Sequence, residues 1–178
     1  FDSKVTDIYI NNGNIESVTI NENEKIDAQI VILAIGHSAR DTYKMLYENG
    51  VKIIQKPFAI GARIEHPQTL INKSQYKEFY NHPKLGAADY RLVTHTSNGR
   101  TAYTFCMCPG GSVIASASED GQVVTNGMSE HARDKANANS GFLVNVLPAD
   151  FGSDHPLAGV DFQEKYEKKK KIVIWIII

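Results

Sequence analysis

The segment that most constrains the fold is residues 30–35, Ile-Val-Ile-Leu-Ala-Ile, an unbroken apolar run that ends at Gly36. Such a run is typical of a strand covered on both faces, as in a parallel sheet between helices. A chain of 178 residues, 42% hydrophobic and 22% charged, can form the core that such a strand requires. We therefore expect a buried strand at residues 30–35.

The neighbouring residues predict a hairpin and a helix. Short β-rich runs flank residues 11–14, Asn-Asn-Gly-Asn, as a hairpin requires. After Gly36, Ser38 and Asp41 have the spacing of a capping box, and Gly50 stands where a helix would end. A strand, a Gly turn and a helix start together occupy the position at which open α/β sheets bind nucleotides. A plain strand-to-helix connection explains the same spacing equally well.

The rest of the chain predicts a mostly antiparallel sheet or open barrel. Asn98-Gly99 and Asp120-Gly121 supply turns between short β-rich runs. We expect strands at residues 58–64, 90–95, 101–106, 112–117 and 122–125. We expect helical character at residues 67–80, with Pro67 near its first turn, a helix or loop at 130–137, and a helix at 161–169.

Residues 103–111, Tyr-Thr-Phe-Cys-Met-Cys-Pro-Gly-Gly, form the most distinctive motif. On a regular strand Cys106 and Cys108 face the same side. They then serve either as small buried side chains or as ligand-facing thiols. A disulfide or a metal pair is the role that their spacing favours least. Gly110 and Gly111 permit close approach of a ligand to the backbone, although any hairpin uses glycines similarly. The sequence predicts no metal site and identifies no catalytic residue.

Two polar side chains complete the candidate ligand-facing set. Asn126 would belong to a polar rim. Arg133, like Arg63, could hold an anionic substrate through a two-pronged contact, although a surface position is the commoner state for either arginine. His37, His66 and His131 stand in motif-like settings, where a lone histidine is more often structural than catalytic.

Charge and cysteine content exclude several classes of protein. Residues 51–100 hold eight Lys or Arg against three acidic residues, but these are scattered rather than clustered with aromatics, so nucleic-acid binding is not expected. Two cysteines separated by one residue make no secreted disulfide framework, which favours a cytoplasmic protein. The closing apolar run is far shorter than the roughly 20 residues of a membrane span. The sequence predicts no oligomeric state.

Five motifs carry a resemblance to known flavoproteins. Residues 32–42 resemble the second flavin-contacting segment of two-dinucleotide-binding-domain flavoproteins, with Ile35 where Thr is common. Four further motifs look like the bacterial FAD-dependent dehydrogenases labelled NAD(FAD)-utilizing dehydrogenases. They are residues 56–67, 85–90, 105–111 and 126–129. The resemblance runs from about residue 1 to Glu167.

The resemblance implies a mixed α/β fragment of a larger oxidoreductase. Residues 1–50 would be part of a Rossmann-like FAD-binding domain with a β-meander, and residues 51–167 an inserted, β-rich substrate-side domain. Residues 168–178 would be a non-family tail, with a cloning or reading-frame artefact as one explanation. No Gly-x-Gly-x-x-Gly loop, the family's main nucleotide motif, occurs in the chain. The fragment alone is therefore expected to be inactive.

The resemblance also implies cofactors and their contacts. FAD would bind the full-length protein, with Ala34, Gly36, His37 and Ser38 among its contacts, and NAD(P) would serve as electron donor or acceptor to a reaction on a small-molecule substrate. The alternative is a non-catalytic β-rich domain that binds a metabolite or a partner. In that case Cys106 and Cys108 could both become serine without effect on flavin redox activity.

Overall fold

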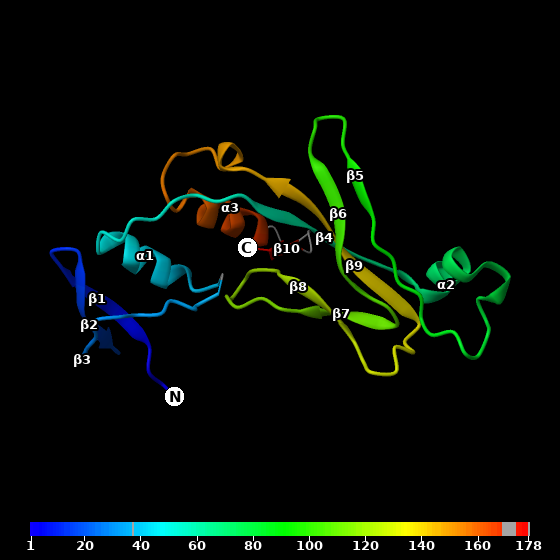
Figure 1. The fold of residues 1–178 in the computed structure, drawn as a ribbon, viewed down its shortest axis with the longest axis horizontal. Coiled ribbons are helices and arrows are strands. Elements are labelled where there is room, and N and C mark those ends of the chain that lie inside the picture. The colour runs from blue at the N-terminus through cyan, green and yellow to red at the C-terminus, as the bar shows by residue number, and fades with distance from the viewer. Residues whose placement is uncertain (37, 169–173, 178) are drawn as a thin grey trace. The chain divides into compact units, whose positions relative to one another are not determined.

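The structure, a computed structural model, describes residues 1–36, 38–168 and 174–177. These residues form two compact units (Figure 1). Unit 1 comprises Phe1–Gln55 with Ser153–Val160, and unit 2 comprises Lys56–Gly152 with Asp161–Ile178. Every strand pair in the described residues is antiparallel, so the chain is mixed α+β with mostly antiparallel sheets, and no Rossmann fold is present in the part described.

Unit 1 contains the predicted hairpin. Strands β1 (Val5–Asn11) and β2 (Asn14–Ile20) are joined at Asn12 and Gly13, whose φ angles are 49° and 79°. Two consecutive positive φ angles are those of a type I′ turn, whose twist matches that of the strands. The prediction of a hairpin is confirmed, and β3 (Glu24–Asp27) adds a third strand beside β2.

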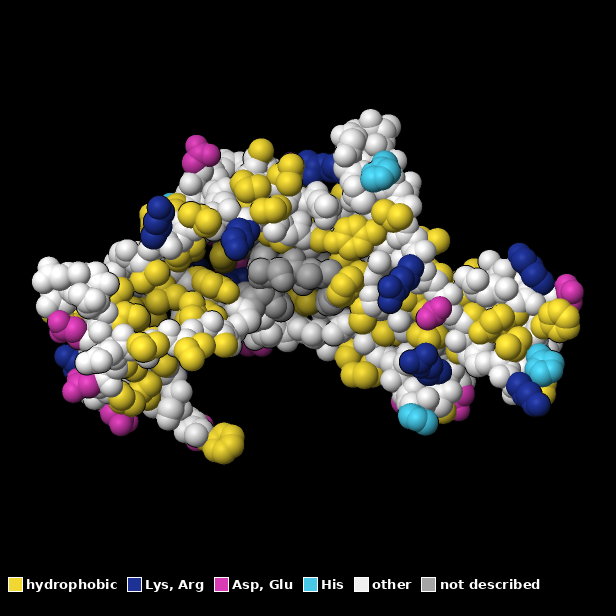
Figure 2. Space-filling model, in the orientation of Figure 1, with side chains coloured by type: hydrophobic (Ala, Val, Ile, Leu, Met, Phe, Trp, Pro, Cys, Tyr) yellow, Lys and Arg dark blue, Asp and Glu magenta, His cyan; other side chains and the backbone are white. Residues whose placement is uncertain are grey.

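The prediction of a buried strand at residues 30–35 is wrong for this chain. The segment belongs to none of the described sheets, and the exposed fractions of Ile30 and Ile32 are 85% and 88%. A buried parallel strand needs hydrogen-bonded neighbours on both sides, and the described strands of this unit are all used in an antiparallel meander. Hydrophobic side chains accordingly lie open to solvent on this part of the molecule (Figure 2).

The helix after Gly36 forms without the expected capping box. Helix α1 (Arg40–Glu48) has Ala39 at its N-cap and no side-chain capping bond. The carboxylate of Asp41 instead forms an ion pair of 2.5 Å with Lys4 and accepts a hydrogen bond of 2.9 Å from the Thr42 amide. At the other end Gly50 has a φ of 78°, as predicted for the residue that ends the helix.

Unit 2 is built on a five-stranded sheet with the order β10-β4-β9-β6-β5 (Figure 1). Its longest strands are β4 (Phe58–Pro67) and β9 (Asn137–Val146), which pair along their whole length. The other three strands are β6 (Thr101–Cys108), β5 (Val93–His95) and β10 (Ile174–Ile177). The prediction of a mostly antiparallel sheet is confirmed, although β5 is shorter than the strand expected at residues 90–95.

Strand β9 lies at the centre of this sheet and was not predicted. Residues 130–136 form the loop that was one of the two expectations there, and the strand follows directly. Its first half, Asn-Ala-Asn-Ser-Gly, has low β propensity. The strand forms because its two neighbours satisfy its backbone, and because burial is complete at Asn139 and Leu143, which both have an exposed fraction of 0%.

A second hairpin packs against this sheet. Strands β7 (Gly111–Ala115) and β8 (Thr125–Ser129) pair with each other and contact β4, β6 and β9. The strand expected at residues 122–125 is displaced, because the Asn-Gly-Met-Ser motif itself forms most of β8. Gly121, with a φ of 75°, lies in the connection between these strands, as predicted.

Helices complete unit 2. Helix α2 (Gln68–Tyr76) and the 3₁₀ turn η1 (Lys77–Phe79) follow β4, with Pro67 at the N-cap rather than at the first helical position. A second 3₁₀ turn, η2 (Pro148–Asp150), follows β9. Helix α3 (Ala158–Glu167), close to the predicted 161–169, belongs to unit 2 from Asp161 onward and supplies aromatic rings to the core. That core contains Phe58, Ile60, Val144, Val146, Phe151, Phe162 and Tyr166.

Candidate functional site

Cys106 lies at a β-bulge in β6. Phe105 pairs with Gly141 and Cys108 with Asn139, so β6 has one residue more than β9 between these two pairs. Cys106 has a φ of 48°, a left-handed conformation that residues other than glycine rarely adopt. The expectation that both sulfurs share one face of a regular strand is wrong, because the bulge leaves Cys106 exposed and Cys108 buried.

A buried arginine holds the bulge in place. Arg63 on β4 has an exposed fraction of 7%, and its Nη1 donates hydrogen bonds of 3.0 Å to the Cys106 carbonyl and 2.7 Å to Asn139 Oδ1. Its Nη2 lies 3.4 Å from Asn126 Oδ1. A buried guanidinium requires such partners. We call these five residues, Arg63, Cys106, Cys108, Asn126 and Asn139, the arginine cluster.

Gly127 on β8 covers the arginine cluster. A Cβ added at this position would lie 2.7 Å from Cys108 Sγ, and closer still to Asn139 Oδ1 and Arg63 Nη1. No side chain fits there without displacing the cluster. The glycine of the Asn-Gly-Met-Ser motif therefore has a packing role between the hairpin and the sheet.

The thiol of Cys108 is turned back toward the bulge. Its Sγ lies 3.4 Å from the Cys106 carbonyl oxygen, to which it donates. Burial raises the pKa of the Cys108 thiol, and the nearby Cys106 thiol raises it further through its charge and a hydrogen bond between the two side chains. The charge and a hydrogen bond of Arg63 act in the opposite direction. Cys108 is thus a protected thiol in contact with both an exposed thiol and a cation.

A pocket of about 440 Å³ opens beside the bulge. It is lined by Asp89, Tyr90, Arg91, Thr104, Phe105, Cys106 and Met107. Its walls combine two aromatic rings, a thioether and a thiol with two hydroxyl groups and two opposite charges. A pocket of this size and mixed lining suits a small polar molecule with an apolar part.

Tyr90, which lines this pocket, is hydrogen-bonded to His66. Its hydroxyl lies 2.7 Å from His66 Nε2, and the two rings are 5.5 Å apart at their centroids. Burial raises the pKa of Tyr90, while a hydrogen bond with Ser140 and the charge of Arg63 lower it. Tyr90 therefore stays protonated at neutral pH. Its hydroxyl either donates to His66 Nε2 or accepts from it, according to the tautomer of the imidazole.

The glycines after the bulge are buried by the chain itself. Gly110 has a φ of 50°, and a Cβ there would collide with the backbone of Arg133. A Cβ on Gly111 would collide with the backbone of Met128. The Gly110 amide donates a hydrogen bond of 2.7 Å to Oε1 of the buried Gln68. Close packing accounts for both glycines, and a ligand contact for either stays a prediction.

The remaining predicted substrate-side residues are separated. Asn126 is half-buried within the arginine cluster, whereas Arg133 is exposed on the loop before β9, with a φ of 51°. Neither lines the pocket beside Cys106. The structure therefore brings Cys106, Cys108 and Asn126 together and leaves Arg133 outside the group.

The turn predicted to contact FAD lies in unit 1. Gly36 is exposed with a φ of 69°, no described atom lies within 4 Å of the position of a Cβ, and its carbonyl accepts a hydrogen bond of 2.8 Å from the Tyr43 hydroxyl. Ala34 is exposed and Ser38 half-buried, while His37 lies outside the described residues. The backbone at Gly36 is therefore open to the approach of a flat ligand, and an FAD contact there stays a prediction.

The helix start beside this turn carries an acidic side chain. Asp41 places a carboxylate in the first turn of α1, where a helix N-terminus attracts an anion, and Lys4 pairs with this carboxylate. A contact of this turn with any part of a flavin nucleotide stays a prediction.

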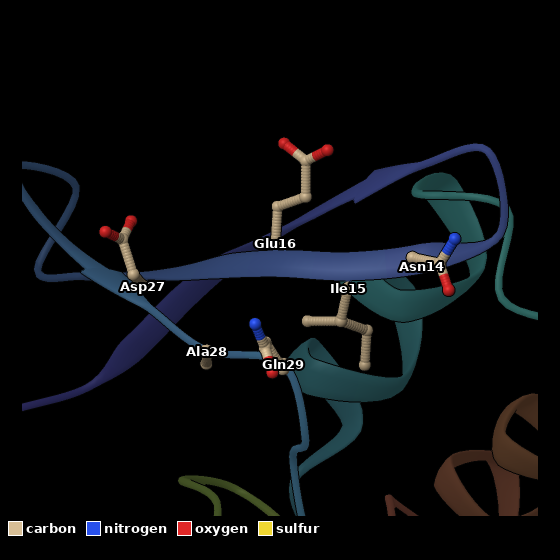
Figure 3. A pocket seen from close by; sticks show the side chains of 6 residues that line it. All are labelled: Asn14, Ile15, Glu16, Asp27, Ala28 and Gln29. Atoms are coloured by element: carbon tan, nitrogen blue, oxygen red, sulfur yellow. The ribbon is translucent and has the colours of Figure 1, made fainter.

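A second pocket, of about 740 Å³, lies on the meander of unit 1 (Figure 3). Ile15 and Glu16 project from opposite sides of β2, so the lining side chains do not converge on one point. Glu16 also accepts a hydrogen bond of 2.9 Å from Asn11. This cavity has no features of a chemical site.

Two negative findings concern only the described residues. They contain no group of three or more His, Cys, Asp or Glu side chains able to hold a metal ion. None of their helices combines the length and apolarity needed to cross a membrane.

Sequence reasoning did not identify Arg63, Tyr90 and His66 as parts of one site. Arg63 was expected on the surface, and the other two belong to different motifs and stand 24 positions apart along the chain. A signal was present in the odd position of Arg63, between the apolar residues Ile60 and Ile64 of a β-rich run. Only the pairing of β4 with β9 shows that the run is central to the sheet.

Comparison with known proteins places these features in a family. The family described as "FAD-dependent protein, C-terminal domain-like" matches residues 57–173. An uncharacterized protein of Clostridium beijerinckii (strain ATCC 51743 / NCIMB 8052) is 54% identical over 168 residues, which are 94% of this chain and 31% of that protein. The chain thus spans about a third of the length of this relative.

The family match includes the arginine cluster, the bulge and the pocket beside it, and it extends past Glu167, where the resemblance was expected to stop. Strand β10, which follows the matched region, pairs with β4. Residues 169–173 and 178 of the expected tail lie outside the described residues. Over most of its length, therefore, the chain belongs to the FAD-dependent protein, C-terminal domain-like family.

Proposed function

We propose that this chain is a piece of an FAD-dependent oxidoreductase, of the dehydrogenase type, and that unit 2 forms its substrate-side wall. The observation that carries this proposal is the coincidence of the family match, residues 57–173, with the unit that holds the pocket at Cys106. Bound FAD would supply the hydride-transfer chemistry of such an enzyme. NAD(P) is proposed as the partner in electron transfer.

The residues of the pocket suggest how a substrate would be held. Tyr90 can donate its hydroxyl proton to a substrate oxygen, with His66 as hydrogen-bond partner on the other side. Arg91 offers a cation for an anionic substituent, and Phe105 lines the apolar part of the same pocket. We therefore propose a small substrate that carries an oxygen function and a negative charge.

Arg63 would act through the bulge rather than by touching the substrate. Its hydrogen bonds to the Cys106 carbonyl and Asn139 fix the shape of one pocket wall. Arg63→Lys keeps the charge but loses the forked geometry. We expect this variant to weaken substrate binding while FAD content is unchanged.

The cofactor is tested on the full-length protein of which this chain is a part. After purification, its visible spectrum is recorded and the flavin released by denaturation is identified by chromatography. We expect oxidised FAD at one equivalent per chain. A full-length protein that stays colourless after incubation with FAD would refute the proposal, and the chain would then be a non-catalytic binding domain.

The pocket is tested on the same protein with two matched variants. Small carboxylic and hydroxy acids are screened by the shift they cause in the unfolding temperature. Tyr90→Phe should abolish the shifts given by wild-type hits, whereas Tyr9→Phe, at an exposed ring on β1, should retain them. Equal shifts in both variants would place the ligand elsewhere.

A further inference from the structure

Cys106 and Cys108 stand two residues apart on an irregular part of β6. Two strand rises of about 3.3 Å put residues i and i+2 about 6.6 Å apart, just inside the outer limit of about 6.8 Å for the Cα atoms of a disulfide. In this structure β6 holds an extra residue against β9, and Cys106 has a φ of 48°. The strand is therefore not regular here, and the side chains of the two cysteines are hydrogen-bonded to each other.

The side chain of Cys108 turns back toward Cys106. Cys108 Sγ donates to the Cys106 carbonyl at 3.4 Å, which turns it back along its own strand. Arg63 Nη1 donates to the same carbonyl at 3.0 Å and fixes its position. Gly127, which leaves no room for a side chain, confines Cys108 Sγ from the hairpin side. Among the described residues, the thiol beside this confined side chain is that of Cys106.

The two thiols differ in exposure. Cys106 has the exposure of an attacking cysteine, and Cys108 has the burial of a resolving cysteine. Cys106 is exposed and lines the pocket, whereas Cys108 has an exposed fraction of 8%. An external disulfide can reach the first sulfur but not the second. The left-handed φ at Cys106 is a strained conformation, and residues in such conformations cluster at functional sites.

We propose that Cys106 and Cys108 form a redox-active dithiol that undergoes thiol–disulfide exchange with low-molecular-weight disulfides. The Cys106 thiolate attacks one sulfur of the external disulfide, breaks its S–S bond and releases one thiol. The Cys108 thiolate then attacks Cys106 Sγ, forms the intramolecular disulfide and releases the second thiol. The chain loses two protons and two electrons, and the external disulfide takes up both to become two thiols.

This inference does not depend on the proposed function, because no step uses FAD. It does affect the same pocket. Closing the disulfide draws Cys106 Sγ toward the buried side and removes a thiol from the wall shared with Tyr90 and Thr104. The oxidised and reduced forms would therefore present different pockets to a ligand.

The test uses the full-length protein and glutathione disulfide. The reduced protein is incubated with glutathione disulfide, alkylated and digested with trypsin. The tryptic peptide Thr101–Arg133 contains both cysteines of this chain and no internal Lys or Arg, so one mass reports on both thiols. We expect the wild-type peptide to lack both alkyl groups and two hydrogen atoms, and dithiothreitol to restore double alkylation.

Single variants separate the two roles. Cys108→Ser should accumulate a glutathione adduct on Cys106, because the resolving thiol is gone. Cys106→Ser should give neither an adduct nor a disulfide, because Cys108 is buried. Cys108→Ala, which keeps an apolar side chain at the buried position, replaces the serine variant if the latter unfolds. A wild-type protein that retains a stable glutathione adduct, or whose thiols both stay unmodified while folded, would overturn the proposal.

Discussion

Gly127 shows how one residue joins two layers of unit 2. Its backbone passes directly over Arg63, Cys108 and Asn139, and the space for a side chain is already filled by their atoms. These three side chains cannot all move aside, because Arg63 and Asn139 hydrogen-bond to each other and Cys108 is confined. The packing of the hairpin on the sheet therefore depends on the absence of a Cβ.

Gly127→Ala should accordingly destabilise the fold. Overpacking a filled core costs about 1–3 kcal/mol, and we expect a loss of that size in the free energy of unfolding measured with urea. Gly86→Ala is the matched control, since a Cβ there meets no described atom within 4 Å. If both variants had the stability of the wild type, Gly127 would not be in close contact with the arginine cluster.

The lowered pKa of Asp150 predicts that the free energy of unfolding depends on pH. Hydrogen bonds from Arg100, then from the Leu147 amide, lower the pKa of Asp150 from 3.8 to about 2. Between these values the unfolded chain binds more protons than the folded one, so stability rises with pH there. The stabilisation is present above pH 3.8 and is lost as the pH falls toward 2.

Asp150→Asn tests this dependence. Its urea midpoint should lie below that of the wild type at pH 7, and the difference should shrink as the pH falls through the window from 3.8 to about 2. Arg100→Gln removes the partner and should reproduce the loss at pH 7. A difference that stays constant down to pH 2 would show that the carboxylate charge is not involved.

At the scale of elements, strand β9 organises unit 2. It lies between β4 and β6, and Leu143 at its middle has an exposed fraction of 0%. Because both neighbours depend on it for their hydrogen bonds, a loss of packing at Leu143 affects the whole sheet. The aromatic rings of Phe58, Phe151, Phe162 and Tyr166 pack around Val146, at the C-terminal end of the strand.

Leu143→Ala should cost about 2–5 kcal/mol, the usual range for a buried leucine. Leu92→Ala is the matched control, because Leu92 is 61% exposed and its truncation should change stability by less than about 0.5 kcal/mol. Both values come from urea unfolding followed by circular dichroism. Equal losses would mean that β9 is not the centre of the core.

At the scale of the whole molecule, the exposed apolar run of unit 1 stands out. Ile30 and Ile32 are almost fully exposed, yet their sequence is that of a buried strand. The chain spans 31% of its relative, which is consistent with a covering that comes from other parts of a longer protein. In this chain alone the run should promote association between copies of the chain.

Replacing both Ile30 and Ile32 by serine should leave the free energy of unfolding of this chain within about 0.5 kcal/mol of the wild type. The same change should reduce the binding of a hydrophobic dye and the association seen by light scattering. Ile60→Ser, at a buried side chain, is the contrasting variant and should lower stability strongly. A large loss of stability in the double variant would show that the run is packed after all.

The success of the sequence predictions differs between elements for a physical reason. The hairpin at Asn12-Gly13 was predictable because two residues fix a type I′ turn. Strand β9 was not, because its polar first half becomes a strand only between two partners. At the candidate site, the motif around Cys106 and Cys108 was recognised, but its geometry was wrong, since a bulge depends on pairing with Asn139 and Gly141.

The sequence by itself determined what depends on a few neighbouring residues: the turns, the antiparallel character of unit 2 and the resemblance to FAD-dependent proteins. The tertiary structure alone decided the burial of Arg63, the meeting of Tyr90 with His66, and the exposure of residues 30–35. Each of these depends on which strand lies beside which. The local sequence does not encode that choice, because the energy of burial comes from contacts between residues far apart in the chain.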